Sequence, residues 1–442
     1  MLFSVCRRAR EALRRRAIED VPATNIEAEE EKFEEPDPAS WLKSICGSLR
    51  RNDSLDTLDI DAQKTSLADD DILTLYDALR NNHVLSNLLF RNIRFKMNNT
   101  LNLEPISKDA NTSIKLLHIE ESGKQILAMG LSLTSYDYIR TLNLKGNLID
   151  VQSAEAIGLI LQSNGSLREL RICHNRFDDE GIKFLANGLR KNRNLKILDL
   201  LENGLNDKAI LELMHSMCYN DSLEFLCLDF NNFGFAGVQA ISRMLKKNTC
   251  LKELHLFGNR IDSHGAGRIA EGLCHNSTLH TLILSYNQIG DQGAKALAQA
   301  LTVNSTITKL WCPSNQIGNE GLQSIGRALP GMKGLEELHM DDLFDDFAAL
   351  DLIEGMKFNT RVTTLYIESP IFAHDWVESK LDFYLRMNKS GRSILYAPNA
   401  PLSLWAPAFA KANRNCNEKG APDVLYTILR QKPEMFDSVI II

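Results

Sequence analysis

The sequence predicts an α/β solenoid: about twelve strand–helix units stacked into a horseshoe, with an inner parallel sheet and outer helices. The first observation behind this prediction is a strict spacing. One asparagine recurs every 28 residues, at Asn147, Asn175, Asn203, Asn231, Asn259, Asn287 and Asn315. A short apolar alternation precedes each asparagine, and an apolar helical face follows it. A fixed period of this length is typical of a repeat array in which each unit packs only on its neighbours.

Each unit opens with a strand of the pattern L-x-x-L-x-L-x-x-N-x-L, as in Leu251, Leu254, Leu256 and Asn259. Successive strand side chains point to opposite faces, so Leu254 and Leu256 both point toward the core. The asparagine comes where the chain turns inward, and its amide offers two donors and an acceptor to the backbone groups of that bend. We therefore expect the stacked asparagine side chains to form a ladder through the solenoid.

A helix follows each strand. One apolar helical face is formed at the spacing i, i+3, i+4, i+7 by Ala294, Leu297, Ala298 and Leu301. A small residue at the helix start lets the turn approach the neighbouring repeat, and most helices open with one of Gly181, Gly237, Gly265, Gly293 and Gly321. A second asparagine series, from Asn164 to Asn304, ends the helices. We expect these residues to adopt the left-handed conformation that asparagine tolerates.

Less regular units flank this regular part. Each of their strands starts three residues after an asparagine, at Leu55, Leu85, Ile114 and Val362. Together with the units from Ile139 to Leu335, they bring the array to twelve strand–helix units. The predicted solenoid covers residues 39–374 and includes an N-terminal helical cap whose apolar face runs from Trp41 to Leu49.

The segments outside the solenoid differ from it in composition. Residues 1–38 are arginine-rich and then acidic, so we expect a disordered segment, because so many like charges do not collapse into a core. An alternative interpretation of residues 1–17 is an organelle presequence. Residues 375–436 lose the period, and their apolar helical patterns predict a C-terminal helical cap. Residues 437–442 form an apolar tail to which the sequence assigns no role.

The 28-residue unit with an outer helix resembles the ribonuclease-inhibitor type of leucine-rich repeat. The same repeat class occurs in NOD-like receptors and in Ran GTPase-activating protein. The resemblance covers roughly residues 55–370 and is tightest over 139–330. It implies a horseshoe, and the horseshoe also follows physically. A helix is about 10 Å wide and strands lie about 4.8 Å apart, so the stack bends toward its strands.

Composition and motifs exclude several classes of function. The net charge of -7 disfavours nucleic acid as a partner, and no apolar run reaches the roughly 18 residues of a membrane span. Nine scattered cysteines, with no CxxC pair and no Cys/His cluster at metal-ligand spacing, indicate reduced thiols in a cytoplasmic or nuclear protein. Phosphate-loop, dinucleotide and hydrolase motifs are absent from the sequence. We therefore expect no enzyme activity, cofactor, metal or small-molecule substrate.

The candidate site is the inner face of the sheet. Strand residues that point away from the core, and the turn residues after them, should lie side by side in neighbouring repeats. The predicted partner-binding residues are Phe225, Phe230, His255, Phe257, Ile283, Tyr286, Trp311, His339 and Tyr366, flanked by the acids Asp199, Glu202 and Asp229. An exposed aromatic patch indicates a binding surface. The alternatives are that the N-terminal segment covers the patch or that some side chains are buried.

The sequence therefore favours a non-catalytic scaffold or regulator that binds a protein on its concave face. The acidic flank predicts a basic partner. The alternative implied by the resemblance is a GTPase activator of the Ran GTPase-activating type, although no arginine here can be matched to that family's catalytic one. A run from Asp341 to Asp346 interrupts the repeat where Leu343 replaces the ladder asparagine. We interpret this run as an exposed turn rather than a cation site.

Overall fold

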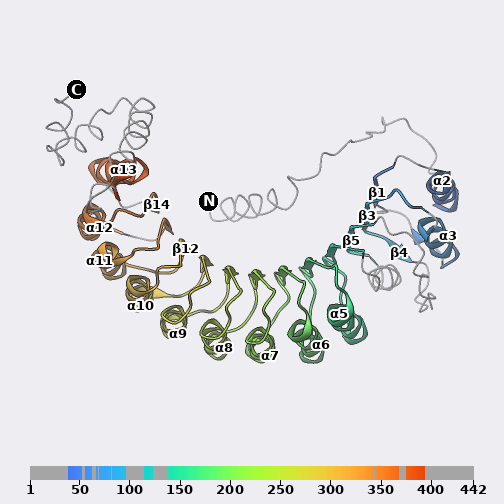
Figure 1. The fold of residues 1–442 in the computed structure, drawn as a ribbon, viewed down its shortest axis with the longest axis horizontal. Coiled ribbons are helices and arrows are strands. Elements are labelled where there is room, and N and C mark those ends of the chain that lie inside the picture. The colour runs from blue at the N-terminus through green and yellow to red at the C-terminus, as the bar shows by residue number, and fades with distance from the viewer. Residues whose placement is uncertain are drawn as a thin grey trace, which may run out of the picture.

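The described residues form one curved, open sheet of twelve parallel strands with helices along its outer side (Figure 1). The computed structural model describes residues 38–51, 55–61, 66–67, 69–80, 82–95, 114–122, 138–341, 344–367 and 375–393. The strands of this sheet have the same order in space as along the chain, and every neighbouring pair is parallel. These features confirm the predicted α/β leucine-rich-repeat solenoid, with its inner sheet and outer helices.

The twelve strands line the inner side of the horseshoe. Most are only three residues long, which is the length of the apolar alternation in the repeat. They are β1 (Thr57–Asp61), β3 (Asn87–Arg91), β5 (Leu116–Glu120), β6 (Thr141–Asn143), β7 (Glu169–Arg171), β8 (Ile197–Asp199), β9 (Phe225–Cys227), β10 (Glu253–His255), β11 (Thr281–Ile283), β12 (Lys309–Trp311), β13 (Glu337–Met340) and β14 (Thr364–Ile367). Sequence patterning did not predict a second, two-stranded sheet of β2 (Ser66–Leu67) and β4 (Arg94–Phe95).

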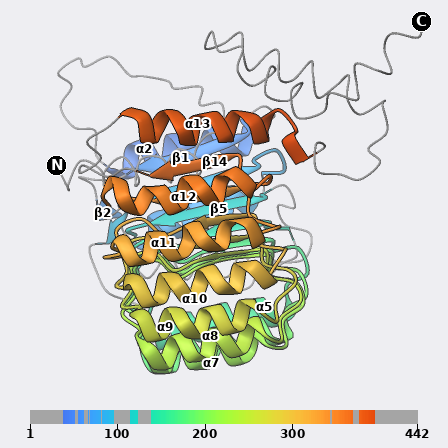
Figure 2. The same ribbon diagram turned by 90° about the vertical axis from the view of Figure 1, so that its left-hand side faces the viewer.

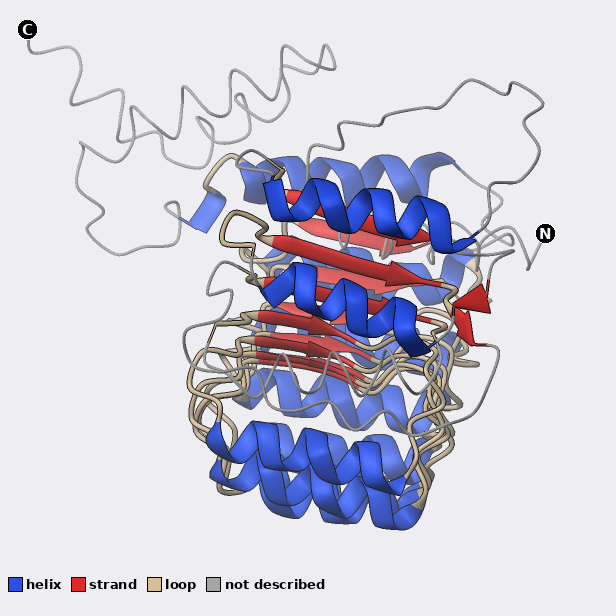
Figure 3. Cartoon of the chain, turned by 90° about the vertical axis from the view of Figure 1, so that its right-hand side faces the viewer, coloured by secondary structure: helices blue, strands red, loops and turns tan. Residues whose placement is uncertain are grey.

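The helices form the outer layer and stack side by side (Figures 2 and 3). They are α2 (Pro38–Arg51), α3 (Asp69–Arg80), α5 (Val151–Ser163), α6 (Asp179–Lys191), α7 (Asp207–Met217), α8 (Phe235–Leu245), α9 (Ser263–Leu273), α10 (Gly290–Val303), α11 (Asn319–Ala328), α12 (Asp346–Phe358) and α13 (Asp375–Lys389), with a 3₁₀ turn at Leu329–Gly331. Helix α2 packs on α3 and α13 on α12, so helices cap both ends. Within the described part, no helix has the length and apolarity needed to cross a bilayer.

The predicted segments at the two ends lie mostly outside the described residues. This applies to the disordered segment and presequence of residues 1–37, to residues 394–436 of the C-terminal cap and to the tail at 437–442. Those interpretations therefore stay predictions.

One continuous hydrophobic core lies between the sheet and the helices. The strand leucines that the period placed inward, such as Leu254 and Leu256, are fully buried. The helix face of Ala294, Leu297, Ala298 and Leu301 is buried against them. Each repeat thus contributes one strand stripe and one helix stripe to a core that runs through all the repeats.

The ladder asparagines make the predicted hydrogen bonds. Asn175 is completely buried, and its Nδ2 donates to the carbonyl oxygens of Leu144 at 2.9 Å and Cys173 at 3.0 Å. Its Oδ1 accepts the backbone N–H of Asn147 at 2.9 Å and of Ile149 at 3.4 Å. One amide therefore satisfies backbone groups of two successive repeats, and this repeated use of its donors and acceptor explains the 28-residue spacing.

The expectation for the second asparagine series is wrong. Asn192, which follows α6, has φ −66° and ψ 139°, so it is extended rather than left-handed. Its Oδ1 accepts the backbone N–H groups of Asn194 and Leu195, and its Nδ2 donates to the Leu161 carbonyl at 2.7 Å. Asparagine is used here for its side-chain amide, which forms a second ladder between helix ends, and not for its backbone freedom.

The helix starts use aspartates and small residues. Asp178 and Asp262 each cap their own helix by accepting the N–H of the glycine three residues on. Asp291 instead accepts N–H groups of the next helix, from Gly318 at 2.6 Å and Gly321 at 2.9 Å. A Cβ on the opening glycine Gly293 would lie 2.8 Å from a side-chain atom of the preceding helix, as the predicted close approach requires.

The acidic run after β13 is a helix cap and an inter-repeat contact. Asp345 caps α12 by accepting the Ala348 N–H at 2.9 Å. Asp341 accepts the Ser314 N–H of the preceding repeat at 2.6 Å. Carboxylates thus make backbone hydrogen bonds next to the point where the ladder asparagine is missing.

Close helix contacts give a test of the packing. A Cβ at Gly355 in α12 would clash with the Gly326 carbonyl oxygen of α11. Gly355→Ala is therefore expected to lower the free energy of unfolding by about 2 kcal/mol, because the helices must separate. Gly267→Ala in α9, where a Cβ meets nothing within 4 Å, is expected to raise it by about 1 kcal/mol. Urea unfolding followed by circular dichroism distinguishes the two variants. Changes of the same sign in their free energies of unfolding would contradict this packing.

Candidate functional site

The inner face presents one side chain per strand in an unbroken line. Parallel pairing is in register, so that His255 lies opposite both Cys227 and Ile283, and Trp311 opposite both Ile283 and His339. We call these residues the middle line. Its members from β8 to β14 are Asp199, Cys227, His255, Ile283, Trp311, His339 and Tyr366. The 28-residue period therefore predicts the neighbours from Asp199 to His339, and Tyr366 follows His339 after 27 residues.

Six successive repeats each contribute one aromatic ring to this face. We call them the aromatic series: Phe230, Phe257, Tyr286, Trp311, His339 and Tyr366. The ring centroids of Phe257 lie 4.7 Å from Phe230 and 4.8 Å from Tyr286. Those of His339 lie 4.7 Å from Trp311 and 5.5 Å from Tyr366, both in stacked geometry. Rings at these distances attract one another and hold an ordered surface.

Two rings of the series stand on an unfavourable backbone. Phe230 has φ 51° and Tyr286 has φ 56°, both in the left-handed region. The equivalent turn position carries Gly146 and Gly258 in two other repeats, and glycine adopts this conformation without a side-chain penalty. In three further repeats it carries His174, Glu202 and Ser314, which are also left-handed. A bulky residue there costs about 1–2 kcal/mol. The left-handed turn is therefore a general feature of the repeat, and it places the side chains of Phe230 and Tyr286 just after their strands.

Glu337 contacts the polar ring atoms of two strand residues in the aromatic series. The indole Nε1 of Trp311 donates to Glu337 at 2.9 Å, and His339 Nε2 lies 2.9 Å from the same carboxylate. Lys309 Nζ is 3.4 Å away. Burial lowers the pKa of His339, although Glu337 opposes that shift. The polar atoms of Trp311 and His339 are therefore directed to Glu337, and the ring faces stack on one another.

Three predicted surface residues are buried. His255 is 5% exposed, Ile283 is 7% exposed and Asp229 is 4% exposed, so none of them lies on the accessible patch expected from the sequence. Phe225 packs edge-on against His255 at 4.8 Å, and the Phe257 N–H donates to Asp229 at 2.7 Å. The cause is curvature, because the sheet bends toward its inner face and crowds the side chains there. Their predicted role in partner binding is not tested by this placement.

The acidic flank differs from the expected rim of free carboxylates. Asp199 is half-buried and accepts the Leu201 N–H at 3.1 Å. Glu202 is exposed and lies 3.0 Å from His174 Nδ1. Asp229 is buried. Each of the three predicted acids thus has an internal partner, and Glu202 remains the most accessible of them.

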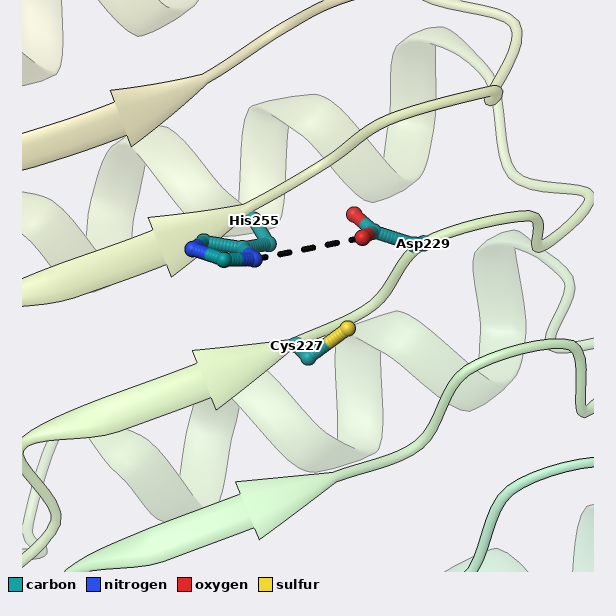
Figure 4. A group of neighbouring side chains, drawn as sticks. All are labelled: Cys227, Asp229 and His255. Carbon is teal, nitrogen blue, oxygen red and sulfur yellow. Dashed lines mark ion pairs between the residues drawn. The ribbon is translucent and has the colours of Figure 1, made fainter. Parts of the chain in front are cut away.

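The inner face also brings together a cysteine, an aspartate and a histidine. Ligand atoms of Cys227, Asp229 and His255 lie within 4.8 Å of one another (Figure 4). The sequence shows no metal-ligand spacing here, because His255 lies a full repeat of 28 residues after Cys227. The aligned repeats could have shown it, since Cys227 and His255 occupy the same position of adjacent units.

Comparisons with known proteins identify the repeat. A leucine-rich-repeat family model matches residues 163–186, 247–270 and 275–298. Among solved structures, the chain is similar to actin-binding site 2 of leiomodin-1, with 23% identity and a TM-score of 0.32 over 34% of this chain and 89% of that one. It is also similar to the tropomodulin C-terminal domain of Caenorhabditis elegans, with 18% identity and a TM-score of 0.30 over 34% of this chain and 92% of that one. No curated protein matches the chain.

The repeat matches and the geometry agree. Each matched segment runs from a helix end through a strand into the next helix, which is one strand–helix unit of the solenoid. The twelve-stranded parallel sheet continues the same unit on either side of the matched segments. The described part of the chain therefore has the fold of a leucine-rich-repeat solenoid, and the matched segments are three of its units.

Proposed function

We propose that this solenoid is a non-catalytic scaffold or regulator that binds a protein partner on its concave face. The observation that carries the proposal is the aromatic series, one ring from each of six successive repeats. Tyr366 is 47% exposed, and Phe230, Phe257 and Tyr286 are each only partly buried. Aromatic side chains are typical anchors of protein interfaces, because they bury a large area with little loss of conformational freedom.

The extent of the aromatic series suits a protein rather than a small molecule. Six strands at about 4.8 Å spacing extend over about 24 Å. A specific interface covers about 800 Å² on each partner, and a surface of this length is compatible with that area. We also propose that the repeats are of the ribonuclease-inhibitor type, on the basis of their 28-residue length and their outer α-helices.

The proposed partner is basic, because Glu202 is exposed and Asp199 lies on the same face. Complementary charge would mainly accelerate association, so capture should weaken as salt rises. We do not extend the proposal to GTPase activation. No arginine of the early repeats can be matched to that family's arginine, and Arg91 on β3 is bound to Asp59 through two guanidinium nitrogens.

The test is partner capture by the immobilised full chain, measured by quantitative mass spectrometry. The variant combines Tyr286→Asn with Trp311→Ala, since asparagine accepts the left-handed backbone at position 286. We expect the recovery of specific partners to fall more than about tenfold. The matched control combines Phe347→Ala with Phe358→Ala, two aromatics on outer helix α12 that are 78% and 55% exposed.

The control is expected to leave recovery unchanged, and circular dichroism should show both variants folded. Partners that are lost only from the concave variant support the proposal. Equal recovery on both variants, or a loss confined to the α12 control, would refute it. Capture at low and high salt tests the charge of the partner separately.

A further inference from the structure

The cysteine, aspartate and histidine on β9 and β10 share one small space. Cys227 ends β9, Asp229 follows it by two residues, and His255 ends β10 directly opposite Cys227. Figure 4 shows the sulfur of Cys227 and the imidazole of His255 both directed toward the carboxylate of Asp229. All three residues are buried. Among the described residues, this is the group of histidine, cysteine and acidic side chains whose ligand atoms converge.

Contacts outside the group fix two of these side chains. His255 Nε2 lies 2.6 Å from Glu253 Oε1. Asp229 Oδ1 accepts the Phe257 N–H at 2.7 Å. In a neutral ring that donates from Nε2, Nδ1 keeps a lone pair. Metal-binding histidines are commonly oriented by a carboxylate at the other ring nitrogen in this way.

The remaining atoms are positioned as ligands. His255 Nδ1 and Asp229 Oδ2 lie 3.9 Å apart, which is beyond a hydrogen bond. Zinc bonds of about 2.0–2.3 Å put neighbouring tetrahedral ligands about 3.3–3.8 Å apart. The Cys227 sulfur lies within 4.8 Å of both atoms. Side-chain movements of about 1 Å would therefore bring the nitrogen, the oxygen and the sulfur around one ion.

We propose that Cys227, Asp229 and His255 form a zinc(II) site with three protein ligands on the inner face of the solenoid. One sulfur, one nitrogen and one oxygen donor suit zinc better than magnesium or calcium, which select oxygen ligands. Binding converts the Cys227 thiol to a thiolate and releases its proton to solvent. A water molecule completes the tetrahedron. This site does not depend on partner binding by the aromatic series.

A buried carboxylate beside a buried thiol is a poor arrangement for stability alone. Hydrophobic residues at these positions would bury without a desolvation penalty, as Ile283 does on the next strand. A divalent cation compensates both the carboxylate and the thiolate. The ion would also join two adjacent repeats next to Phe225, whose ring packs on His255, and Phe257, whose backbone N–H donates to Asp229.

The experiment uses the full chain, stripped with a chelator and then titrated with zinc or cobalt(II). We expect one equivalent of zinc after dialysis, by elemental analysis, and a thiolate-to-cobalt charge-transfer band. Cys227→Ser should abolish that band and lower zinc affinity more than about tenfold. Glu253→Gln should keep the band and weaken binding about 10–100-fold, since it removes only the positioning carboxylate.

Cys173→Ser is the matched control, because Cys173 is a buried free cysteine near the inner face two strands away. It should bind zinc like the wild type. If Cys227→Ser fails to fold, His255→Gln is measured instead, and it should also lower zinc affinity more than about tenfold. Zinc should also raise the melting temperature of the wild type and not that of either ligand variant. Failure of the wild type to retain zinc, or loss of binding in Cys173→Ser alone, would overturn the proposal.

Discussion

Asn175→Ala is expected to lower the free energy of unfolding by about 3–5 kcal/mol, the largest loss that we predict for one substitution. The variant removes an amide that satisfies two carbonyl oxygens and two backbone N–H groups. Asn175 is completely buried, so alanine leaves these groups without partners away from water. Urea unfolding followed by circular dichroism measures the loss.

The matched control is Asn187→Ala on the exposed side of α6. It is expected to change stability by less than about 0.5 kcal/mol, since alanine suits a helix at least as well as asparagine. A loss below about 1 kcal/mol in Asn175→Ala would mean that water or neighbouring groups replace the amide. Each repeat packs only on its neighbours, so a weakened repeat can unfold before the others. The variant should therefore also broaden the unfolding transition.

Most of the fold could be predicted from the sequence, because its determinants repeat. The ladder asparagine, the inward leucines and the opening glycines each occur in most of the regular units from Ile139 to Leu335, so a single period predicts strands, helices and register together. Asn192 shows where this reasoning failed. Its position at a helix end was predicted, but the choice between backbone freedom and side-chain hydrogen bonding depends on the carbonyl of Leu161, one repeat earlier.

The site was harder to predict than the fold for a related reason. Strand alternation states which face a side chain points to, but exposure on a curved inner face depends on the neighbouring repeats. His255 is covered by Phe225, and Asp229 by the backbone that follows β10. The same crowding assembled the Cys227 group, which no spacing along the chain indicates. Comparing equivalent positions of adjacent units would have shown it.

Asp229→Asn is expected to stabilise the metal-free protein at neutral pH by up to about 3 kcal/mol. Burial raises the pKa of Asp229 from 3.8 to about 6, partly opposed by His255 and by the Phe257 amide. In the unfolded chain the carboxyl group ionises near its usual value. The folded protein therefore loses stability as pH rises between those two values and carries the full penalty above about pH 6. Asparagine retains the acceptor for the Phe257 N–H and adds no charge.

Thermal or urea unfolding in the presence of a chelator, at pH 8 and near pH 4, measures the stability that Asp229→Asn gains. Asp229→Asn should be more stable than the wild type at pH 8. Most of this difference should be gone near pH 4, close to the unfolded pKa of 3.8, where Asp229 is neutral in the folded state. Asp221→Asn, at an exposed acid, should change stability by less than about 0.5 kcal/mol. A variant less stable than the wild type at pH 8 would contradict the burial argument. Zinc should narrow or reverse the difference in stability between Asp229→Asn and the wild type, because only the wild type keeps all three ligands. A carboxylate that destabilises the metal-free fold then stabilises the metal-bound one.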